Sequence, residues 1–268
     1  MIRDPYVAGA FYPDSESELL NYFKNLEPER FDIKFNKILG VVVPHAGYEY
    51  SGKIAWASYS ILKEYNARRF LIIGPNHYGY PFYPAIYSNG SWRTPLGDSI
   101  IDNELSEQLI MKSGIIKNDP ETHSTEHSIE VQLPFLQYIF KNQFTFVPLI
   151  LGDQSYEISR DLGETILSLD RIPLIIASSD LNHYESYDKN NEKDEIIIND
   201  IINLRIKDFF NDIYKYRITA CGFGAIAVLM YITKKNHGKI ALLRHANSGD
   251  ASGDRKRVVG YAAMLAYS

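Results

Sequence analysis

The sequence predicts an α/β protein, a three-layer α/β/α sandwich with a largely parallel central sheet. Three apolar, β-branched runs show no polar alternation, which suits strands buried on both faces. They occupy residues 38–43, 70–74 and 174–178. Helical patterns separate such runs, as in βαβ units. Each run also stops at a small polar turn that carries a histidine, namely His45, His77 and His183.

In chain order, the first half predicts a helix over 54–65, a strand over 71–74 and one or two short strands within 80–97. A helix over 103–111 follows, with Asp102 as its N-cap. Apolar residues at helical spacing predict another helix over 127–140, in which Pro134 either introduces a kink or marks the true start.

The second half predicts a strand over 144–151, a helix over 156–169 and one long helix over 194–210. Residues 223–231 are apolar all round and predict a buried helix. Strands over 241–244 and 258–266 complete the chain. The polar residues 244–254 between them predict a flexible loop near the site, and His245 is interpreted as structural, whereas His237 is expected at the surface.

Composition indicates a single globular domain over 1–268, since 45% of the residues are hydrophobic and 23% are charged. A net charge of −5 argues against a nucleic-acid partner. Cys221 is the single cysteine, so no internal disulfide can form and a reducing compartment is expected. Because neither a signal peptide nor an apolar run of about 20 residues is apparent, we expect a cytoplasmic protein without a membrane partner.

Histidines that follow buried strands are candidate ligands, because ligands of α/β sheets bind at the carboxyl ends of strands. His45 and His77 could meet there across neighbouring strands, although a histidine satisfied by backbone groups remains the alternative. Asp180 lies three residues before His183, so the pair could act as acid and base or help to bind a metal. The alternative is that Asp180 caps the following turn.

Cys221 precedes an apolar helix, where the helix dipole would favour a thiolate, although free cysteines are more often inert core residues. Residues 122–132 are rich in polar groups but do not match the H-E-x-x-H pattern. Among them, His127 and Glu130 are candidate substrate contacts, and Glu126 and Gln132 are candidates for contacting a substrate or supporting the ligands. A helix cap is the alternative reading of this stretch. Tyr48 is a further candidate substrate contact, at the rim of the pocket.

Five ordered motifs together resemble the Memo family. They are PHAGY at 44–48, GPNH at 74–77, EHSIEVQLPFL at 126–136, SSDLNHY at 178–184 and CG at 221–222. The resemblance begins at residue 3, continues to residue 262 and covers nearly the whole chain. In eukaryotes, this family is named as a mediator of receptor-driven cell motility.

The resemblance implies the fold of the class III extradiol dioxygenases, which are non-haem iron enzymes. It also implies a pocket lined by His45, His77, Asp180, His183 and Cys221. The cysteine takes the place of a carboxylate ligand of the dioxygenases. A thiolate is softer than a carboxylate, which favours copper, zinc or a differently tuned iron, so ring cleavage is not expected to follow from the fold.

The leading hypothesis is a metal-binding, dioxygenase-like oxidoreductase of unknown substrate. His45, His77 and Cys221 would hold iron or copper, with zinc as a further option, and Asp180 and His183 would be the catalytic acid and base. The first alternative is a non-catalytic binding module for a small molecule or a peptide. The second is zinc-assisted hydrolysis. The sequence makes no prediction of oligomeric state.

Overall fold

The computed structural model describes residues 1–27 and 29–268 and shows an α/β fold with a mostly parallel, mixed sheet. The main path of strands runs β1-β5-β6-β8-β3-β9-β2-β12-β10, and β11 pairs with β12. Its strands are β1 (Ile2–Arg3), β2 (Ile38–Val43), β3 (Arg69–Pro75), β5 (Ser91–Thr94), β6 (Gly97–Ile101), β8 (Thr145–Leu151), β9 (Leu174–Ser178), β10 (His183–Glu185), β11 (Lys239–Asn247) and β12 (Val258–Tyr267). The short β4 (Ala85–Ile86) and β7 (Lys117–Asn118) pair with each other, and β4 also pairs with β8.

The centre of the sheet consists of β8, β3, β9 and β2, which are parallel to one another. On the β2 side, β12 is antiparallel to β2 and to both of its other neighbours, β10 and β11. The three strands predicted from the apolar runs are therefore adjacent, in the order β3, β9, β2. Their carboxyl ends meet at one edge of the sheet.

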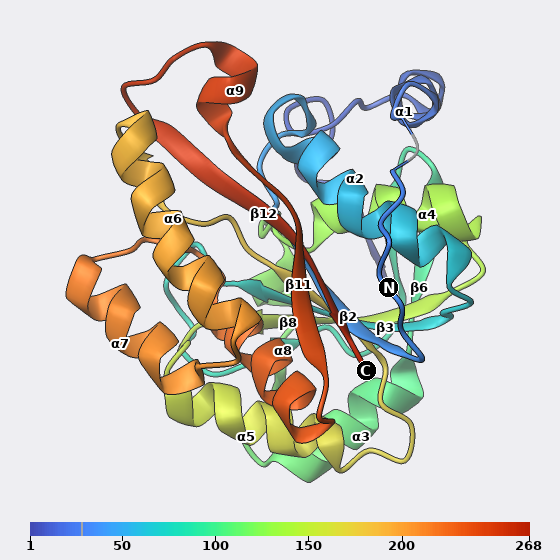
Figure 1. Cartoon of the computed structure of the whole chain (residues 1–268). Helices are drawn as coiled ribbons and strands as arrows, with labels where there is room; N and C mark the ends of the chain where they lie inside the picture. The colour runs from blue at the N-terminus through green and yellow to red at the C-terminus, as the bar shows by residue number, and fades with distance from the viewer. Residues whose placement is uncertain (28) are drawn as a thin grey trace.

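Helices cover both faces of this sheet (Figure 1). One hydrophobic core contains residues of α3 (Asn103–Ser113), α5 (Tyr156–Leu167), α6 (Tyr187–Ile202), α7 (Ile206–Tyr216) and α8 (Phe223–Lys235). The other contains residues of α1 (Glu16–Lys24), α2 (Tyr48–Glu64) and α4 (Leu133–Phe140). Successive β3 residues alternate between the two cores, with Leu71 in the first and Ile72 in the second. Burial on both faces explains why these strands are continuously apolar.

The predicted elements are mostly found, with boundaries that differ by several residues. The helix predicted over 127–140 begins at Leu133, with Pro134 in its first turn, so the proline marks its start. The 3₁₀ turns η1 (Glu121–His123) and η2 (Glu130–Gln132) precede it. Asp102 is the N-cap of α3, as predicted, and its side chain accepts a hydrogen bond from the Leu105 backbone N–H.

The single long helix predicted over 194–210 is wrong, because the chain forms α6 and α7 with a break between them. Leu204 adopts a left-handed conformation with φ 52°. The Arg205 N–H bonds back to the Asp200 carbonyl, and the Leu204 N–H bonds to the Ile201 carbonyl. This pair of bonds is the Schellman arrangement that ends a helix, here formed without the usual glycine.

The flexible loop predicted over 244–254 is also wrong. Strand β11 continues to Asn247, and α9 (Ser248–Ser252) follows it. Asn247 and Asp250 form a reciprocal capping box that satisfies the first turn of α9. His245 lies in β11 and bonds to the buried Asp194 of α6 at 3.0 Å, in agreement with its structural interpretation. His237 is exposed, as expected.

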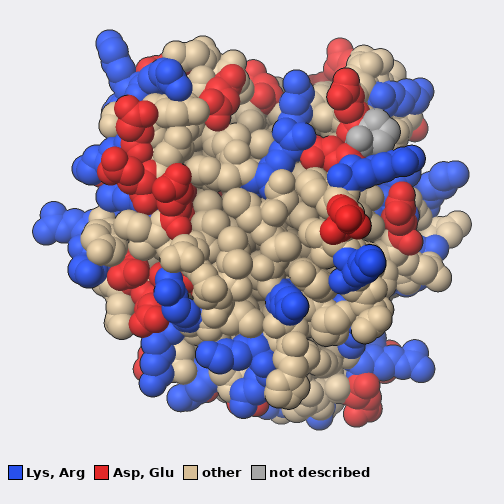
Figure 2. Space-filling view, viewed as in Figure 1, with Lys and Arg blue, Asp and Glu red and all other residues tan. Residues whose placement is uncertain are grey.

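Charged side chains of both signs lie mainly around the edge of the face seen in Figure 2, and uncharged atoms occupy its centre. Positive and negative side chains are interspersed around this edge. Within the described residues, the structure has no helix whose length and apolar character would let it cross a bilayer.

Candidate metal centre

The carboxyl ends of the adjacent strands bring the predicted histidines together. His45 follows β2 and His77 follows β3, but the prediction that these two strands are neighbours is wrong, because β9 lies between them and pairs with both. Asp180 follows β9. Two glycines permit the close approach of further segments. A Cβ at Gly74 would lie 2.4 Å from Ser128 Oγ, and one at Gly222 would lie 2.3 Å from the Ser178 carbonyl oxygen. Segments 126–128 and 221–222 thereby reach the same edge of the sheet.

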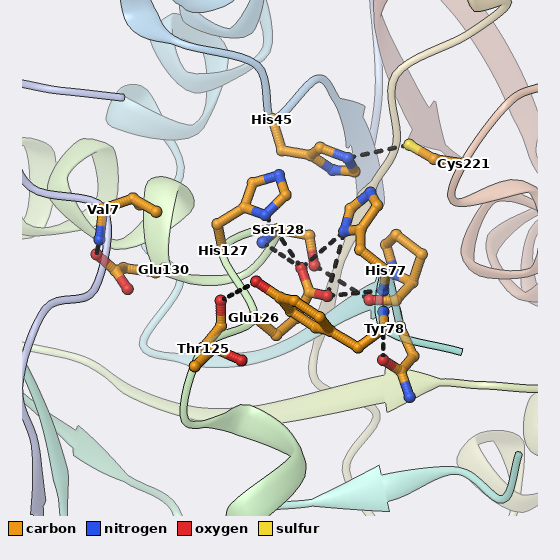
Figure 3. A network of polar contacts seen from close by, with 12 residues as sticks. Val7, His45, His77, Tyr78, Thr125, Glu126, His127, Ser128, Glu130 and Cys221 are labelled. Carbon is orange, nitrogen blue, oxygen red and sulfur yellow. Dashed lines mark hydrogen bonds and ion pairs between the residues drawn. The ribbon is translucent and has the colours of Figure 1, made fainter. Parts of the chain in front are cut away.

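Three imidazoles converge at this edge (Figure 3). One nitrogen from each of His45, His77 and His127 lies within 4.8 Å of the other two, so these residues could hold a metal ion. The rings of His77 and His127 are stacked, with centroids 4.6 Å apart. His45 is only 2% exposed, whereas the His77 side chain is 30% exposed. The cluster therefore extends from a buried ring to a partly exposed one.

Cys221 lies beside this cluster, on the loop that precedes α8. Its Sγ is 3.0 Å from His45 Nε2, and the Asp180 backbone N–H donates to the sulfur at 3.3 Å. Of the predicted ligands, His45 is thus close to both His77 and Cys221. His127, predicted as a substrate contact, is the third member of the histidine cluster.

Glu126 is a buried carboxylate beneath two of the histidines. Its Oε1 lies 2.9 Å from His77 Nδ1 and accepts the Ser128 N–H, and its Oε2 accepts the His77 N–H. His127 Nδ1 is 3.6 Å from Oε1 (Figure 3). One carboxylate therefore connects segments 75–77 and 126–128, which is the supporting role considered for Glu126.

The pKa values in the cluster follow from burial and from Glu126. Burial lowers the pKa of His45 well below its ordinary value, and the neighbouring imidazoles lower it further. Burial also lowers the pKa of His127, to about 4, against the opposing charge of Glu126. Burial would lower the pKa of His77 as well, but the hydrogen bond and charge of Glu126 outweigh it and raise that pKa. The rings of His45 and His127 are therefore neutral near neutral pH, and each has a nitrogen lone pair available.

The two acidic groups next to the cluster respond in opposite ways. Burial opposes ionisation of Glu126, but its hydrogen bonds and the nearby imidazoles lower its pKa to about 2. Burial raises the pKa of the Cys221 thiol well above its ordinary value, and the charge of Asp180 raises it further. Without a cation nearby, Glu126 is therefore ionised and Cys221 is a thiol.

Asp180 and His183 lie at the same edge but are held by backbone groups. Asp180 Oδ1 accepts the His45 backbone N–H at 2.8 Å. His183 Nδ1 bonds to the Thr219 carbonyl oxygen at 2.8 Å, and its ring is not part of the three-histidine cluster. Burial raises the pKa of Asp180, against the lowering effect of His183.

The polar atoms of Tyr48 and Glu130 are engaged inside the protein. The Tyr48 hydroxyl donates to the Val131 carbonyl oxygen. The Glu130 side chain is fully buried and forms an ion pair with Arg3, while the Tyr12 hydroxyl also donates to it. In this structure, Glu130 fastens the N-terminal segment to the loop that carries His127, and its substrate-binding role remains a prediction.

Ser178 was a candidate cap and Gln132 a candidate substrate contact or support; in the structure Ser178 contacts the His45 ring, and Gln132 donates to Ser178. Ser178 was visible as the residue where an apolar run ends, and Gln132 as part of a polar segment near a predicted helix start. Neither signal specified which ring these side chains would meet. His123, in the same polar segment, is fully buried against Trp92, with ring centroids 5.7 Å apart.

Comparison with known proteins agrees with the arrangement of these motifs. The family model described as Memo-like protein matches residues 3–265. A MEMO1 family protein of Thermoplasma volcanium is 48% identical over 266 residues, covering 99% of this chain and 98% of the relative. A second, of Thermoplasma acidophilum, is 45% identical over 265 residues, with 99% and 98% coverage. A third, of Sulfurisphaera tokodaii, is 40% identical over 281 residues, with 98% and 99% coverage. The chain therefore belongs to the Memo family.

Proposed function

We propose that this protein is a metal-binding oxidoreductase of unknown substrate, with iron or copper held at the carboxyl edge of the sheet. The observation that carries the proposal is the convergence of His45, His77 and His127, whose ligand atoms lie within 4.8 Å of one another. A cluster of imidazoles with one partly exposed ring leaves room for a further ligand on the metal, as in catalytic sites more than in closed structural ones. The third or fourth ligand would be Cys221, which is in contact with His45.

The donor set fits such a metal. Imidazole suits iron, copper and zinc, and a thiolate shifts the preference toward the softer ions. The raised pKa of Cys221 applies to the protein without a nearby cation, and a bound metal would favour its deprotonation. When bound, iron or copper would supply electron transfer to or from an oxygen-bearing substrate.

The surrounding residues support this chemistry in specific ways. His183 donates its Nδ1–H to the Thr219 carbonyl oxygen, so its Nε2 is left to accept or return a proton. Asp180 accepts the backbone N–H of His45, and burial raises the pKa of its carboxyl group above the ordinary value. Acid–base roles for both residues remain part of this proposal. The substrate is a small molecule or a peptide that enters beside His77.

We also propose that the fold is the three-layer α/β/α sandwich of the class III extradiol dioxygenases. Two features support it. Helices cover both faces of the mostly parallel sheet, and the histidine cluster lies at the carboxyl ends of the central strands. Because folds host many chemistries, this proposal extends to architecture and not to ring cleavage.

The test is the metal content and oxygen consumption of protein purified without oxygen. Near-stoichiometric iron or copper in the wild type, lost in His45→Ala and reduced in Cys221→Ser, is the expected result. Wild-type protein that takes up neither metal on reconstitution contradicts the proposal. Zinc alone, without oxygen consumption, favours hydrolysis.

The second candidate is a non-catalytic binding module that uses the same pocket. It is favoured by the engagement of the Asp180 carboxylate with backbone N–H and by the raised pKa of the Cys221 thiol. Both features leave few groups free for chemistry. This candidate would be supported if the metal-free protein binds a peptide or small molecule and substitution of His77 weakens that binding.

A further inference from the structure

Two hydrogen-bond networks, which both include the Ser128 backbone, contact the far sides of His45 and His77. His45 Nδ1 lies 2.9 Å from Ser178 Oγ, and His77 Nδ1 lies 2.9 Å from Glu126 Oε1. A neutral imidazole carries its proton on one nitrogen, so the partner of Nδ1 decides whether Nε2 has a free lone pair. The donors and acceptors in each network therefore determine which ring nitrogen carries the proton.

The network under His45 begins at two backbone carbonyl oxygens, which can only accept. Gln132 Nε2 lies 2.9 Å from the Pro44 carbonyl oxygen, which fixes the orientation of the amide, and the same nitrogen donates to Ser178 Oγ at 2.9 Å. The Ser178 hydroxyl donates its proton to the Ser128 carbonyl oxygen at 2.7 Å. A hydroxyl has one proton, so Ser178 can only accept from His45. His45 therefore carries its proton on Nδ1.

The orientation of Gln132 is supported at its other end. Its Oε1 accepts the Tyr59 hydroxyl at 2.9 Å, and both side chains are fully buried. A flipped amide would place Oε1 against the Pro44 carbonyl oxygen and leave two acceptors facing each other in the interior, which is costly. The free Nε2 of His45 then faces Cys221 Sγ at 3.0 Å.

The network under His77 leads to the same result through a carboxylate. Glu126 accepts the backbone N–H of Ser128 and of His77, both of which are obligate donors. An ionised carboxylate has acceptor sites only, so the His77 Nδ1 beside it must carry a proton. The other ring nitrogen of His77 points toward His45 and Cys221 (Figure 3).

We propose that Ser178, oriented by Gln132, and Glu126 are positioning residues that hold His45 and His77 in the Nδ1–H tautomer, so that both Nε2 lone pairs face the metal. The inference rests on the metal centre proposed above. Metal-binding histidines commonly donate their second N–H to a carboxylate or carbonyl oxygen, which fixes the ring and its basicity. Here, each ring has its own network, and the two share no acceptor for a ring N–H.

The experiment follows the ring nitrogens by NMR in metal-free protein labelled with ¹⁵N-histidine, at a pH alkaline enough to make every ring neutral. We expect both rings to be Nδ1–H in the wild type. Ser178→Ala should bring His45 into exchange with the Nε2–H form and leave His77 unchanged. Glu126→Gln should bring His77 into exchange with the Nε2–H form and leave His45 unchanged. The reason is that the NH₂ group of the new amide would face one of the three N–H groups that the carboxylate accepts.

Each variant serves as the matched control for the other. Ser58→Ala removes a similarly buried hydroxyl, whose partners are the backbone carbonyls of Val42 and Met264, and should alter neither ring. The His183 ring, which donates to the Thr219 carbonyl oxygen, should remain Nδ1–H throughout. Glu126→Ala, which removes the acceptor altogether, replaces Glu126→Gln if that variant does not fold.

Titration with Zn²⁺ alone gives a second readout. Each positioning variant should bind Zn²⁺ on the order of 10–100-fold more weakly than the wild type. Rings that remain Nδ1–H in both variants overturn the inference, whatever the metal affinity. Wild-type rings that are Nδ1–H in a protein unable to bind any metal instead defeat the proposed function and leave the tautomer assignment intact.

Discussion

The two ends of the central strands both carry polar side chains but use them differently. At the amino ends, Arg69 of β3 pairs with Asp102, and Thr145 of β8 donates to the same carboxylate. These polar groups are partners of one another. At the carboxyl ends, hydrogen bonds hold the outer nitrogens of His45 and His77, while their inner nitrogens face a shared space. The cluster at the amino ends thus satisfies its polar groups internally, whereas the histidine cluster leaves one nitrogen of each ring facing a common point.

The largest expected effect is on metal binding. His77→Ala removes one of three converging nitrogens, so we expect near-stoichiometric metal in the wild type and little in the variant. Asp102→Asn, at the opposite end of the same sheet, should keep full metal content because it touches none of the three histidines. Elemental analysis of the purified, reconstituted proteins measures both. Equal loss in the two variants would mean that the effect is on folding.

The second prediction distinguishes Cys221 from His127 as the ligand that joins His45 and His77. Cys221 contacts His45, whereas His127 contributes to the cluster within 4.8 Å. If the thiolate is a ligand, Cys221→Ser should weaken copper binding on the order of tenfold or more and remove any sulfur-to-metal charge-transfer absorption. His127→Ala should then have the smaller effect. The opposite ranking of the two affinities would assign the position to His127.

The ion pair between Arg3 and Glu130 supports the histidine-bearing loop. Their side chains are 4% and 0% exposed, and Arg3 also donates to the carbonyl oxygens of His123 and Glu126. Arg3→Met leaves a buried carboxylate unpaired, so we expect a loss of about 3–5 kcal/mol in the free energy of unfolding. Urea denaturation measures it. A loss below about 1 kcal/mol would show that the backbone donors to Glu130 suffice.

The smallest expected effect is the pH dependence of the amino-end pair. Burial opposes ionisation of Asp102, but hydrogen bonds from Arg69, Leu105 and Thr145 lower its pKa below the unfolded value of 3.8. A lowered folded pKa stabilises the protein above the unfolded pKa, and that stabilisation is lost as pH falls through the folded value. The stability difference between the wild type and Asp102→Asn should therefore be constant above about pH 5 and shrink below about pH 4. A difference that grows on acidification would contradict this sign.

Local sequence patterns were sufficient for much of the fold. The β-branched runs at 38–43, 70–74 and 174–178 correctly predicted buried strands, because a strand that is covered on both faces has no polar position. Asp102 was recognisable as a cap from its place before a helical pattern. The break at Leu204 was not recognisable, since the usual glycine is absent and the apolar spacing continues through it.

In the candidate site, too, some features could be predicted from local sequence and others could not. His45 and His77 could be paired in advance, because both follow buried strands and parallel strands end at one edge. The place of His127 could not, because it lies on a loop whose path depends on contacts made elsewhere. Among these contacts are the packing of Ser128 against Gly74 and the hydrogen bond from Arg3 to the Glu126 carbonyl oxygen.

Patterns in the chain alone were enough to predict the α/β class, the buried central strands, the strand-end histidines and the family. These depend on hydrophobic period and on short ordered motifs, which are local properties of the chain. The fold was needed to show that His127 lies with His45 and His77, that Glu126 lies beneath two rings and that Ser178 accepts from His45. The contact of His77 with Glu126 joins residues 49 positions apart, and that of His45 with Ser178 joins residues 133 positions apart, so no local pattern specifies either.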